Sequence, residues 1–197
     1  VRIVKNLPKN VPVIATTATA NDRVVEDVNE QLGPGLYITR GPLARNTLRL
    51  QAIPLEDQAE RLAWLAENME ELPGSGIIYC LTVADCRRVT DWLSKQGYEV
   101  LDYHAKLDNE AREARESMLL KNEVKALVAT VALGMGFDKP DLGFVVHLGA
   151  PSSPVAYYQQ VGRAGRAVAS ADVLLLPTPA DREIWHYFAT AAMPSQD

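Results

Sequence analysis

The residues GIIYCLTVAD (Gly76–Asp85) set the fold prediction for this chain of 197 residues. Gly76–Leu81 is a continuous apolar run of strand length, which is typical of a strand buried on both faces. Thr82 and Asp85 have the spacing of a capping box, which predicts a helix that begins there and runs to about Gln96. A strand followed by a helix is the unit from which parallel sheets are built.

The same alternation continues to the end of the chain. Further strands are predicted at residues 99–104, 125–130, 144–149 and 172–177, and further helices at 109–121, after Pro154 and after Asp181. Ser152-Ser153-Pro154 places a proline near the first turn of the helix that we expect to carry Arg163 and Arg166. The pattern indicates an α/β fold with a mostly parallel sheet and helices on both faces.

The first 56 residues do not follow this alternation. Residues 11–15 are predicted as a strand ending in a small polar run, before an amphipathic helix that ends near Leu32. Residues 36–56 contain Gly41-Pro42 and are predicted as a linker. We therefore expect residues 1–35 to be the last βα unit of a preceding lobe and 57–197 to be one α/β lobe. Without its own sheet, the segment 11–20 is expected to lie on the surface or to pair with another chain.

Composition narrows the class of protein. The net charge is −5 and the isoelectric point is about 5.3, which argue against a general basic coat for nucleic acid, so any such binding must be local. No apolar run has the length of a membrane span and no signal peptide is present, so we expect a cytoplasmic protein without membrane contact. Cys80 and Cys86 lack paired-ligand spacing and are expected to be inert thiols, with no metal site. Because the chain begins with valine in mid-pattern, we expect a piece of a longer protein.

The segment YYQQVGRAGR (Tyr157–Arg166) carries the strongest chemical signal. Arg163 and Arg166 are three residues apart, which on a helical turn places both guanidinium groups on one side. Two convergent guanidinium groups suit a phosphate that gains charge in a transition state, because each is a permanent fork of donors. Taken alone, the same pattern also fits a solvated helix end with ordinary surface arginines.

Six motifs occur in a familiar order: ATTATA (15–20), RNTL (45–48), GIIYCLT (76–82), YHAKL (103–107), VATVALGMGFDKPD (128–141) and YYQQVGRAGR (157–166). Together they resemble the second half of a RecQ-type helicase motor, a superfamily 2 motor with two RecA-like lobes. The resemblance covers about residues 11–176. It implies a RecA-like lobe from a monomeric ATP-dependent DNA helicase that translocates 3′ to 5′ and unwinds duplexes. ATP with Mg²⁺ would bind mainly to the first lobe, and single-stranded and duplex DNA would be the partners.

The resemblance also implies roles for individual residues. Arg166 would be the arginine finger, Arg163 would make a second contact to the γ-phosphate or link it to the first lobe, and Gln160 would help to hold their loop; these three are the catalytic candidates. Asp138 would lie near the ATP ribose, in a loop with Gly134 and Gly136. From the residue alone, Asp138 could equally cap the turn before Lys139-Pro140.

A second group would contact nucleic acid. The resemblance places Thr82, His104, Lys106 and Thr130 on the single-strand track, with Thr17 and Thr19 coupling that track to the ATP site. Small hydroxyl groups at loop positions suit sequence-independent phosphate contacts. From the residues alone, Thr130 could simply satisfy the backbone, His104 could be a structural histidine and Lys106 a solvated charge.

The chain departs from the family pattern at Ala167-Val168 in place of Asp-Gly, at Lys106 in place of glycine and at Gly149 in place of an acidic residue. It contains no G-x-x-x-x-G-K-[ST] loop, no D-E-x-H box and no four-cysteine zinc module. We therefore expect it to supply half of an ATP site. Two alternatives stay open: an RNA helicase or duplex translocase with the same motor, and a non-catalytic adaptor lobe. A dinucleotide-binding oxidoreductase fits poorly, because Gly134 and Gly136 lack a third glycine.

Overall fold

The computed structural model describes residues 8, 11–17, 22–33, 36–39, 41, 45–134 and 136–191. The chain divides into two compact units, Val1–Ala44 and Arg45–Asp197, which are considered separately here. Among the described residues, no helix combines the length and the apolar character needed to span a membrane. Thr19, one of the two predicted coupling residues, lies outside the described residues.

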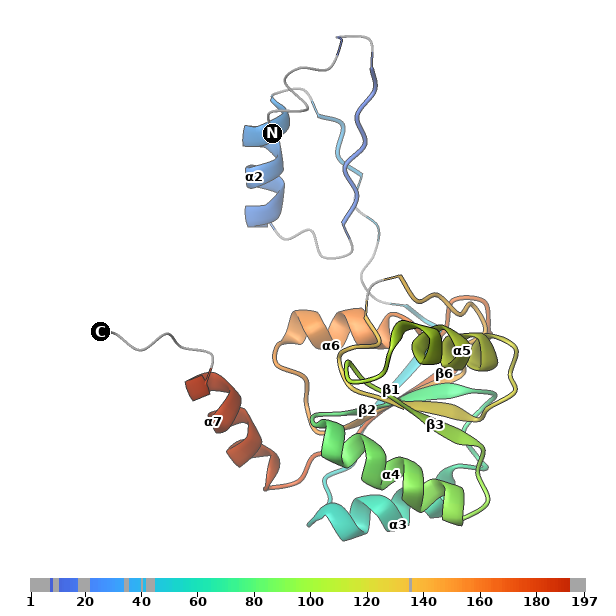
Figure 1. The fold of residues 1–197 in the computed structure, drawn as a ribbon. Coiled ribbons are helices and arrows are strands. Elements are labelled where there is room, and N and C mark those ends of the chain that lie inside the picture. The colour runs from blue at the N-terminus through green and yellow to red at the C-terminus, as the bar shows by residue number, and fades with distance from the viewer. Residues whose placement is uncertain are drawn as a thin grey trace. The chain divides into compact units, whose positions relative to one another are not determined.

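The larger unit is built on a six-stranded sheet in the order β1-β6-β5-β2-β4-β3 (Figure 1). Every pairing between neighbouring strands is parallel. The strands are β1 (Leu48–Ala52), β2 (Gly76–Cys80), β3 (Val100–Tyr103), β4 (Ala126–Ala129), β5 (Phe144–Leu148) and β6 (Ala171–Leu175). β2, β4 and β5 are buried along their whole length, which explains their continuous apolar sequences. The predicted α/β class is confirmed, and the sheet is entirely parallel.

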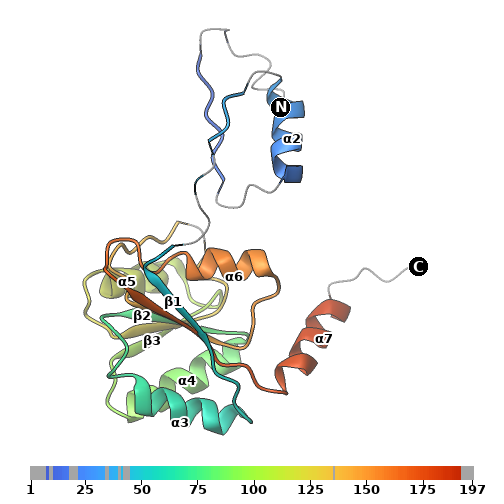
Figure 2. The same cartoon turned by 180° about the vertical axis from the view of Figure 1, so that it is seen from behind.

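Helices cover both faces of this sheet (Figures 1 and 2). They are α3 (Gln58–Asn68), α4 (Val83–Lys95), α5 (Asn109–Leu120) and α6 (Pro154–Val161). A further helix, α7 (Asp181–Ala191), follows β6. α3 and α4 pack on one face, where Leu65, Val89 and Leu93 join a core with Ile78 and Val146. α5 and α6 lie on the other face, whose core includes Leu119 from α5. The two cores share the sheet between them, as the alternation of strands and helices predicts.

Local sequence signals set where these helices begin. The residues before α3, α4, α5 and α6 each accept a hydrogen bond from a main-chain N–H of the first turn; they are Asp57, Thr82, Asp108 and Ser153. Thr82 accepts from the Asp85 N–H at 3.1 Å, and its hydroxyl donates to the Asp85 carboxylate at 2.7 Å. The predicted helix start at Thr82 is therefore confirmed.

β1 lies inside the segment 36–56 that the sequence analysis assigns to a linker. Leu48–Ala52 pairs with β6 at the edge of the sheet, and Arg49 forms an ion pair with Asp172 across the pair at 2.7 Å. Leu48 packs against the core under α5 and α6. The sequence of β1 does not by itself predict a strand, because it combines polar residues with apolar residues that are largely exposed. Its extended conformation depends instead on pairing with β6.

The helix predicted to carry Arg163 and Arg166 ends before them. α6 stops at Val161, and Gly162 is its C-terminal cap. Gly165 has a φ of +69°, which an L-residue rarely adopts, and a Cβ there would lie 2.8 Å from both Leu48 and Thr47. The two glycines thus end the helix and leave the arginines on an irregular turn, contrary to the prediction of a helical one.

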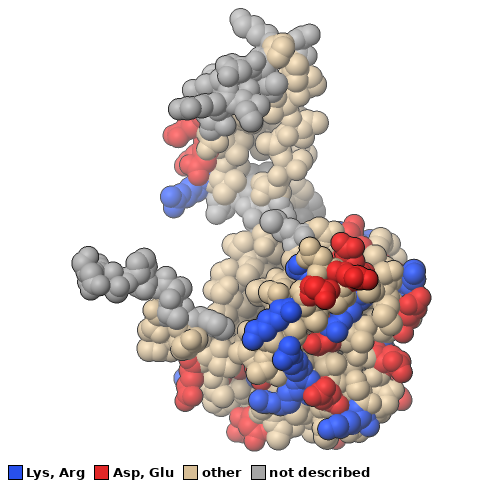
Figure 3. Space-filling view, viewed as in Figure 1, with Lys and Arg blue, Asp and Glu red and all other residues tan. Residues whose placement is uncertain are grey.

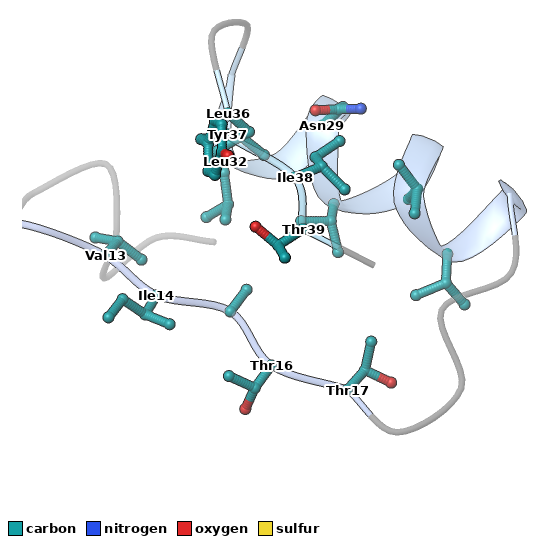
Figure 4. A pocket seen from close by; sticks show the side chains of 14 residues that line it. Val13, Ile14, Thr16, Thr17, Asn29, Leu32, Leu36, Tyr37, Ile38 and Thr39 are labelled. Atoms are coloured by element: carbon teal, nitrogen blue, oxygen red, sulfur yellow. The ribbon is translucent and has the colours of Figure 1, made fainter. Parts of the chain in front are cut away.

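In the described part of the smaller unit, helix α2 (Asp22–Leu32) lies between the irregular segments 11–17 and 36–39. The predicted amphipathic helix is confirmed, whereas residues 11–16 are exposed and do not form the predicted strand. Val24, Val25 and Val28 of α2 face an apolar hollow of about 560 Å³, which Val13, Ile38 and their neighbours also line (Figure 4).

A buried ion pair joins three elements of the larger unit. The side chains of Arg61 in α3 and Asp181 at the start of α7 are only 5% and 8% exposed, and they form a short ion pair. Arg61 Nε also donates to the Leu176 carbonyl at 2.7 Å, and the Thr178 N–H donates to Asp181 at 2.9 Å. Each charge therefore has additional hydrogen-bond partners, which a buried pair requires.

Replacement of Asp181 by asparagine should destabilise the protein by about 3 kcal/mol, because the Arg61 charge would stay buried without a counter-charge. Chemical denaturation measures this loss. The matched control is Asp172→Asn, which removes the partner of Arg49, whose side chain is 64% exposed. That control should cost less than about 1 kcal/mol. Equal losses for the two variants would contradict this account.

Candidate functional site

Four predicted site residues follow the carboxyl ends of three adjacent strands. Thr82 follows β2, His104 and Lys106 follow β3, and Thr130 follows β4. Because β2, β4 and β3 are parallel neighbours, these residues lie along one edge of the sheet. Open α/β sheets bind ligands beyond this edge, so the arrangement favours a shared surface.

These four residues differ in how far they can reach a ligand. Lys106 is exposed and Thr82 is half-buried, whereas Thr130 is 8% and His104 is 0% exposed. His104 Nε2 lies 2.9 Å from Asp102 Oδ2, a distance that suits an ion pair, although the ring orientation gives no hydrogen bond. Arg115 contacts the same carboxylate. His104 therefore shapes the turn after β3 instead of presenting a nitrogen to solvent.

The loop from Thr130 to Asp141 runs from the carboxyl edge of the sheet to its amino edge. At its start, the Thr130 N–H donates to the Tyr103 carbonyl at 3.0 Å. At its end, Gly143 donates to the Ser75 carbonyl at 2.9 Å, immediately before β5 begins. Gly134, Gly136 and Asp138 lie along this loop, so a single segment spans both edges.

Lys139 anchors the far end of this loop, a role that the sequence analysis missed. The residue is 1% exposed, and its ammonium group donates to Asn122 Oδ1 at 2.9 Å and to Asp141 Oδ1 at 2.7 Å. The Lys139 hydrogen bond is the main reason that the pKa of Asp141 lies below its usual value, with Asn122 adding to it. A buried lysine with two oxygen partners fixes where the loop meets the amino edge.

Both arginines of the turn 162–166 bind the same loop. Arg166 Nη1 donates to Asp138 Oδ1 at 2.6 Å, and Arg166 Nε donates to the Gly162 carbonyl at 3.2 Å. Arg163 Nη1 donates to the Phe137 carbonyl at 2.9 Å. The structure thus brings Asp138 close to Arg163 and Arg166, although Asp138 lies well before both arginines in the sequence. The Arg166–Asp138 pair is solvent-accessible, with side chains 38% and 59% exposed.

Two residues of the RNTL motif hold the arginine turn from outside. Arg45 Nη1 donates to the Gly162 carbonyl at 2.9 Å and to the Ala164 carbonyl at 3.4 Å, and the Thr47 hydroxyl donates to the Gly165 carbonyl at 2.8 Å. The sequence analysis assigned neither residue a role. In the sequence, only their place in the RNTL motif pointed to a role. Their partners are main-chain carbonyls, and such contacts cannot be predicted from the pattern of side chains.

The main-chain carbonyl of Gln160 accepts from the Arg163 N–H at 3.2 Å, whereas its side chain points to another partner. This side chain is buried, and its Oε1 lies 2.9 Å from Nε2 of His147 on β5. The His147 ring stacks on Tyr79 with centroids 5.2 Å apart and lies 5.0 Å from Tyr157. Burial lowers the pKa of His147 to about 4, which keeps the imidazole neutral at physiological pH. Gln160 therefore belongs to a buried aromatic cluster beneath α6.

Tyr79 links this aromatic cluster to Arg163. Burial raises the pKa of Tyr79 to about 12, and the nearby Arg163 guanidinium opposes that rise. The Tyr79 hydroxyl also donates to the Leu133 carbonyl at 3.4 Å, on the loop that Arg163 binds. Arg163 is thus set between the loop and the aromatic cluster, and it is half-buried, whereas Arg166 is exposed.

Two further predictions concern reactive groups and charge. Cys80 and Cys86 are buried free thiols, and burial raises the pKa of Cys86 to about 11, so its nucleophilic form is rare. Within the part of the chain that the structure describes, no cluster of histidine, cysteine and acidic side chains is arranged to hold a metal ion. On the face drawn in Figure 3, basic side chains are interspersed with acidic ones.

Gly149, where the family pattern has an acidic residue, follows β5 at the same carboxyl edge. Its φ is +98°, and a Cβ there would lie 2.8 Å from Leu81 Cδ1 and 3.3 Å from the Asp181 carboxyl carbon. A larger residue at this position would be strained by the backbone conformation and would displace the Leu81 side chain.

Residues 59–168 match the family model described as the helicase conserved C-terminal domain. The chain belongs to the helicase C-terminal domain family. The match includes the loop 130–141 and the turn 162–166, so the residues that the structure brings together lie inside the family's defining segment.

Curated relatives of this helicase C-terminal domain are helicases. The chain is 40% identical over 161 residues to the RecQ-like DNA helicase blm-1 of Caenorhabditis elegans, which covers 79% of this chain and 16% of the relative. It is 36% identical over 178 residues to the ATP-dependent DNA helicase Q1 of Mus musculus, covering 88% of this chain and 27% of the relative. The chain therefore spans less than a third of the length of either relative.

The fold also matches solved helicase structures. The structure of Saccharomyces cerevisiae Dbp5 bound to RNA and ADP BeF3 aligns with a TM-score of 0.76 at 20% identity, covering 96% of this chain and 51% of that one. At this identity the match supports the fold alone. The predicted RecA-like architecture of the helicase C-terminal domain is thus confirmed.

The buried His147 predicts a pH dependence of stability. Its pKa is lowered in the folded state, so the folded protein binds fewer protons than the unfolded chain between about pH 6.5 and pH 4. Stability that is complete above pH 6.5 should fall by about 3 kcal/mol as the pH drops to 4.

Urea denaturation at pH 7 and pH 5, for wild type and His147→Phe, measures this dependence. Phenylalanine keeps an aromatic ring between Tyr79 and Tyr157 but cannot be protonated. The variant should therefore lose less stability than wild type between the two pH values. Parallel losses in the two proteins would show that another group is responsible.

Proposed function

We propose that this chain is the second motor lobe of an ATP-dependent DNA helicase and that Arg166 is its arginine finger. The observation that carries the proposal is the convergence of Arg163, Arg166 and Asp138 on a loop that also reaches the carboxyl edge of the sheet. The helicase relatives at 36–40% identity support the motor assignment.

The state of Arg166 suits a finger. Its guanidinium group is exposed and paired with the exposed carboxylate of Asp138. Exposed ion pairs contribute little to stability, so a phosphate can replace the carboxylate at small cost. An arginine stabilises the charge that develops on a transferring phosphoryl group, and it acts only when two lobes close. Arg163, already held by the Phe137 carbonyl, would make the second phosphate contact.

The remaining parts of the ATP site would come from the first lobe. ATP with Mg²⁺ would be held mainly there, because this chain carries no lysine-containing phosphate loop. Asp138 would then turn to the ribose once Arg166 moves to the phosphate. Residues 1–35 would be the end of that first lobe, where Thr17 and Thr19 would couple ATP to the nucleic acid. Thr17 lies on the apolar hollow of the smaller unit (Figure 4).

The nucleic-acid track would lie on the carboxyl edge of the sheet. Lys106 and Thr82 are accessible there, and Thr130 begins the loop that ends at Asp138 and Lys139. A nucleic-acid strand bound beside Thr130 would therefore shift the loop that carries Asp138. Because Arg166 is paired with Asp138, the position of Arg166 would change with it. This path would make hydrolysis depend on nucleic acid, and repeated closure and opening would move a monomeric motor 3′ to 5′.

DNA is the substrate that we favour, because both relatives named above are DNA helicases. RNA is the alternative substrate, because a helicase with the same fold has been solved bound to RNA. The 2′-hydroxyl group is what a protein uses to tell the two apart.

ATP turnover by the full-length parent protein tests the proposal. Single-stranded DNA should stimulate turnover, and Arg166→Ala should reduce the stimulated rate by about 10³-fold or more. The matched control is Arg87→Ala, since Arg87 is also exposed but lies on α4, away from the arginine turn. Stimulation by RNA alone would move the protein to the RNA helicases.

No turnover by the wild-type parent protein would instead favour a non-catalytic adaptor lobe. A loss in Arg87→Ala as large as in Arg166→Ala would remove the finger assignment while leaving the motor in place.

The 197-residue chain by itself should show no ATP turnover, with or without single-stranded DNA, because it lacks the phosphate loop. A coupled-enzyme assay on the purified chain, with the parent protein as positive control, measures this. Turnover that persists through successive purification steps and disappears in Arg166→Ala would show that the chain carries a complete site.

A further inference from the structure

β1 is the edge strand of the sheet, and no described strand pairs with its outer side (Figure 2). The Ile53 N–H donates to the Leu175 carbonyl at 2.8 Å, and the Ala171 N–H donates to the Thr47 carbonyl at 2.8 Å. Backbone groups alternate along a strand, so residues 47, 49, 51 and 53 face β6. The backbone groups of Leu50 and Ala52 consequently point away from the sheet.

This open edge is short and sharply bounded. At one end, the Leu48 N–H donates to the Arg45 carbonyl at 3.2 Å, so it is already satisfied. At the other end, Pro54 occupies the next outward position and has no N–H to offer. The N–H groups of Leu50 and Ala52 have no partner among the described residues. The N–H groups of Leu50 and Ala52, together with the outward carbonyl groups near them, can pair with about three residues of an added strand.

A groove runs beside this edge on the face that α3 covers. It has a volume of about 400 Å³, with Leu72 and Leu174 in its floor and Trp64 and Asn68 in the wall formed by α3. Leu50, which is 62% exposed, lies at the same edge. An extended backbone paired with β1 would send alternate side chains into this groove, which is how sheet-edge sites select peptides.

The charges around the groove select the occupant. Arg49 is neutralised by Asp172 at 2.7 Å, and Lys125 is directed to the Leu72 carbonyl at 2.6 Å. Glu71 lines the groove, and Glu67 and Glu70 are exposed close to it in the sequence. Among the groove-lining residues the Arg49–Asp172 pair is neutral, which leaves the negative charge of Glu71 beside the apolar side chains of Leu50, Leu72 and Leu174.

We propose that β1 and this groove bind an extended peptide of a partner protein, which adds a seventh strand and carries apolar residues flanked by lysine or arginine. A second copy of this chain fits less well. Two-fold antiparallel pairing of β1 with itself would bring the two α3 helices together on one face, with their acidic ends in proximity. The inference does not depend on the proposed motor function, because β1 carries no residue assigned to ATP or nucleic acid.

The test uses the ¹⁵N-labelled 197-residue chain and the capped peptide acetyl-Lys-Val-Leu-Val-Lys-amide, followed by amide chemical shifts. Shifts should be confined to β1 and α3. Ala52→Pro should weaken binding by about three- to tenfold, because it removes one outward donor without touching the β6 ladder. The matched control is Ala52→Val, which keeps the N–H and should bind as wild type does. The peptide with glutamates in place of lysines should bind more weakly.

A second measurement covers the case in which Ala52→Pro fails to fold. Wild-type chain is titrated with peptides N-methylated at each amide in turn, and methylation at alternate positions should abolish binding. Shifts centred elsewhere, equal affinity for Ala52→Pro and Ala52→Val, or indifference to N-methylation would overturn the proposal. So would a dimer in sedimentation that Ala52→Pro dissociates, because the edge would then belong to a second copy.

Discussion

The hydrogen bonds that hold the turn 162–166 against the loop 130–141 are the constraint on which the candidate site depends. The turn has no regular secondary structure, so its shape comes from its neighbours. Gly165 donates to the Leu142 carbonyl at 3.2 Å, Ala167 donates to the Pro140 carbonyl at 2.8 Å, and Thr47 binds the Gly165 carbonyl from the opposite side. Main-chain bonds fix the position of the turn, while the Arg166 side chain lies at the surface, paired with Asp138.

Buried polar groups lie on two sides of the arginine turn: Lys139 at the end of the loop 130–141, and His147 beneath α6. At the amino edge, Lys139 is charged and has two oxygen partners, so the loop ends at one defined place. Under α6, His147 is neutral because it is buried, and Gln160 satisfies one of its nitrogens. Unsatisfied buried groups cost far more than satisfied ones gain, so both networks specify geometry more than they add stability. The arginine turn thus lies between two buried hydrogen-bond networks, one around Lys139 and one around His147.

The fold class could be predicted from the sequence, whereas many of the contacts within the candidate site could not. Apolar runs such as Phe144–Leu148 and caps such as Thr82 carry local signals, and the structure confirms them. β1 was missed because its strand form depends on pairing with β6. The end of α6 was misplaced because helical spacing alone cannot reveal that Gly165 adopts a positive φ. Arg45, Thr47 and Lys139 were missed as anchors because their partners are main-chain carbonyls or distant side chains, and such contacts leave no periodic pattern.

His104 illustrates why residue type does not settle a role. Its position after β3 places it on the same edge as Thr82 and Thr130, which is what a nucleic-acid contact requires. The structure nevertheless buries it against Asp102, a carboxylate that Arg115 also contacts. Contact with a phosphate would require the imidazole to leave this position and to expose an acidic group to the anion. Lys106, two residues further along and exposed, can reach an anion without any rearrangement. The turn after β3 therefore exposes Lys106 and buries the His104 ring beside a carboxylate.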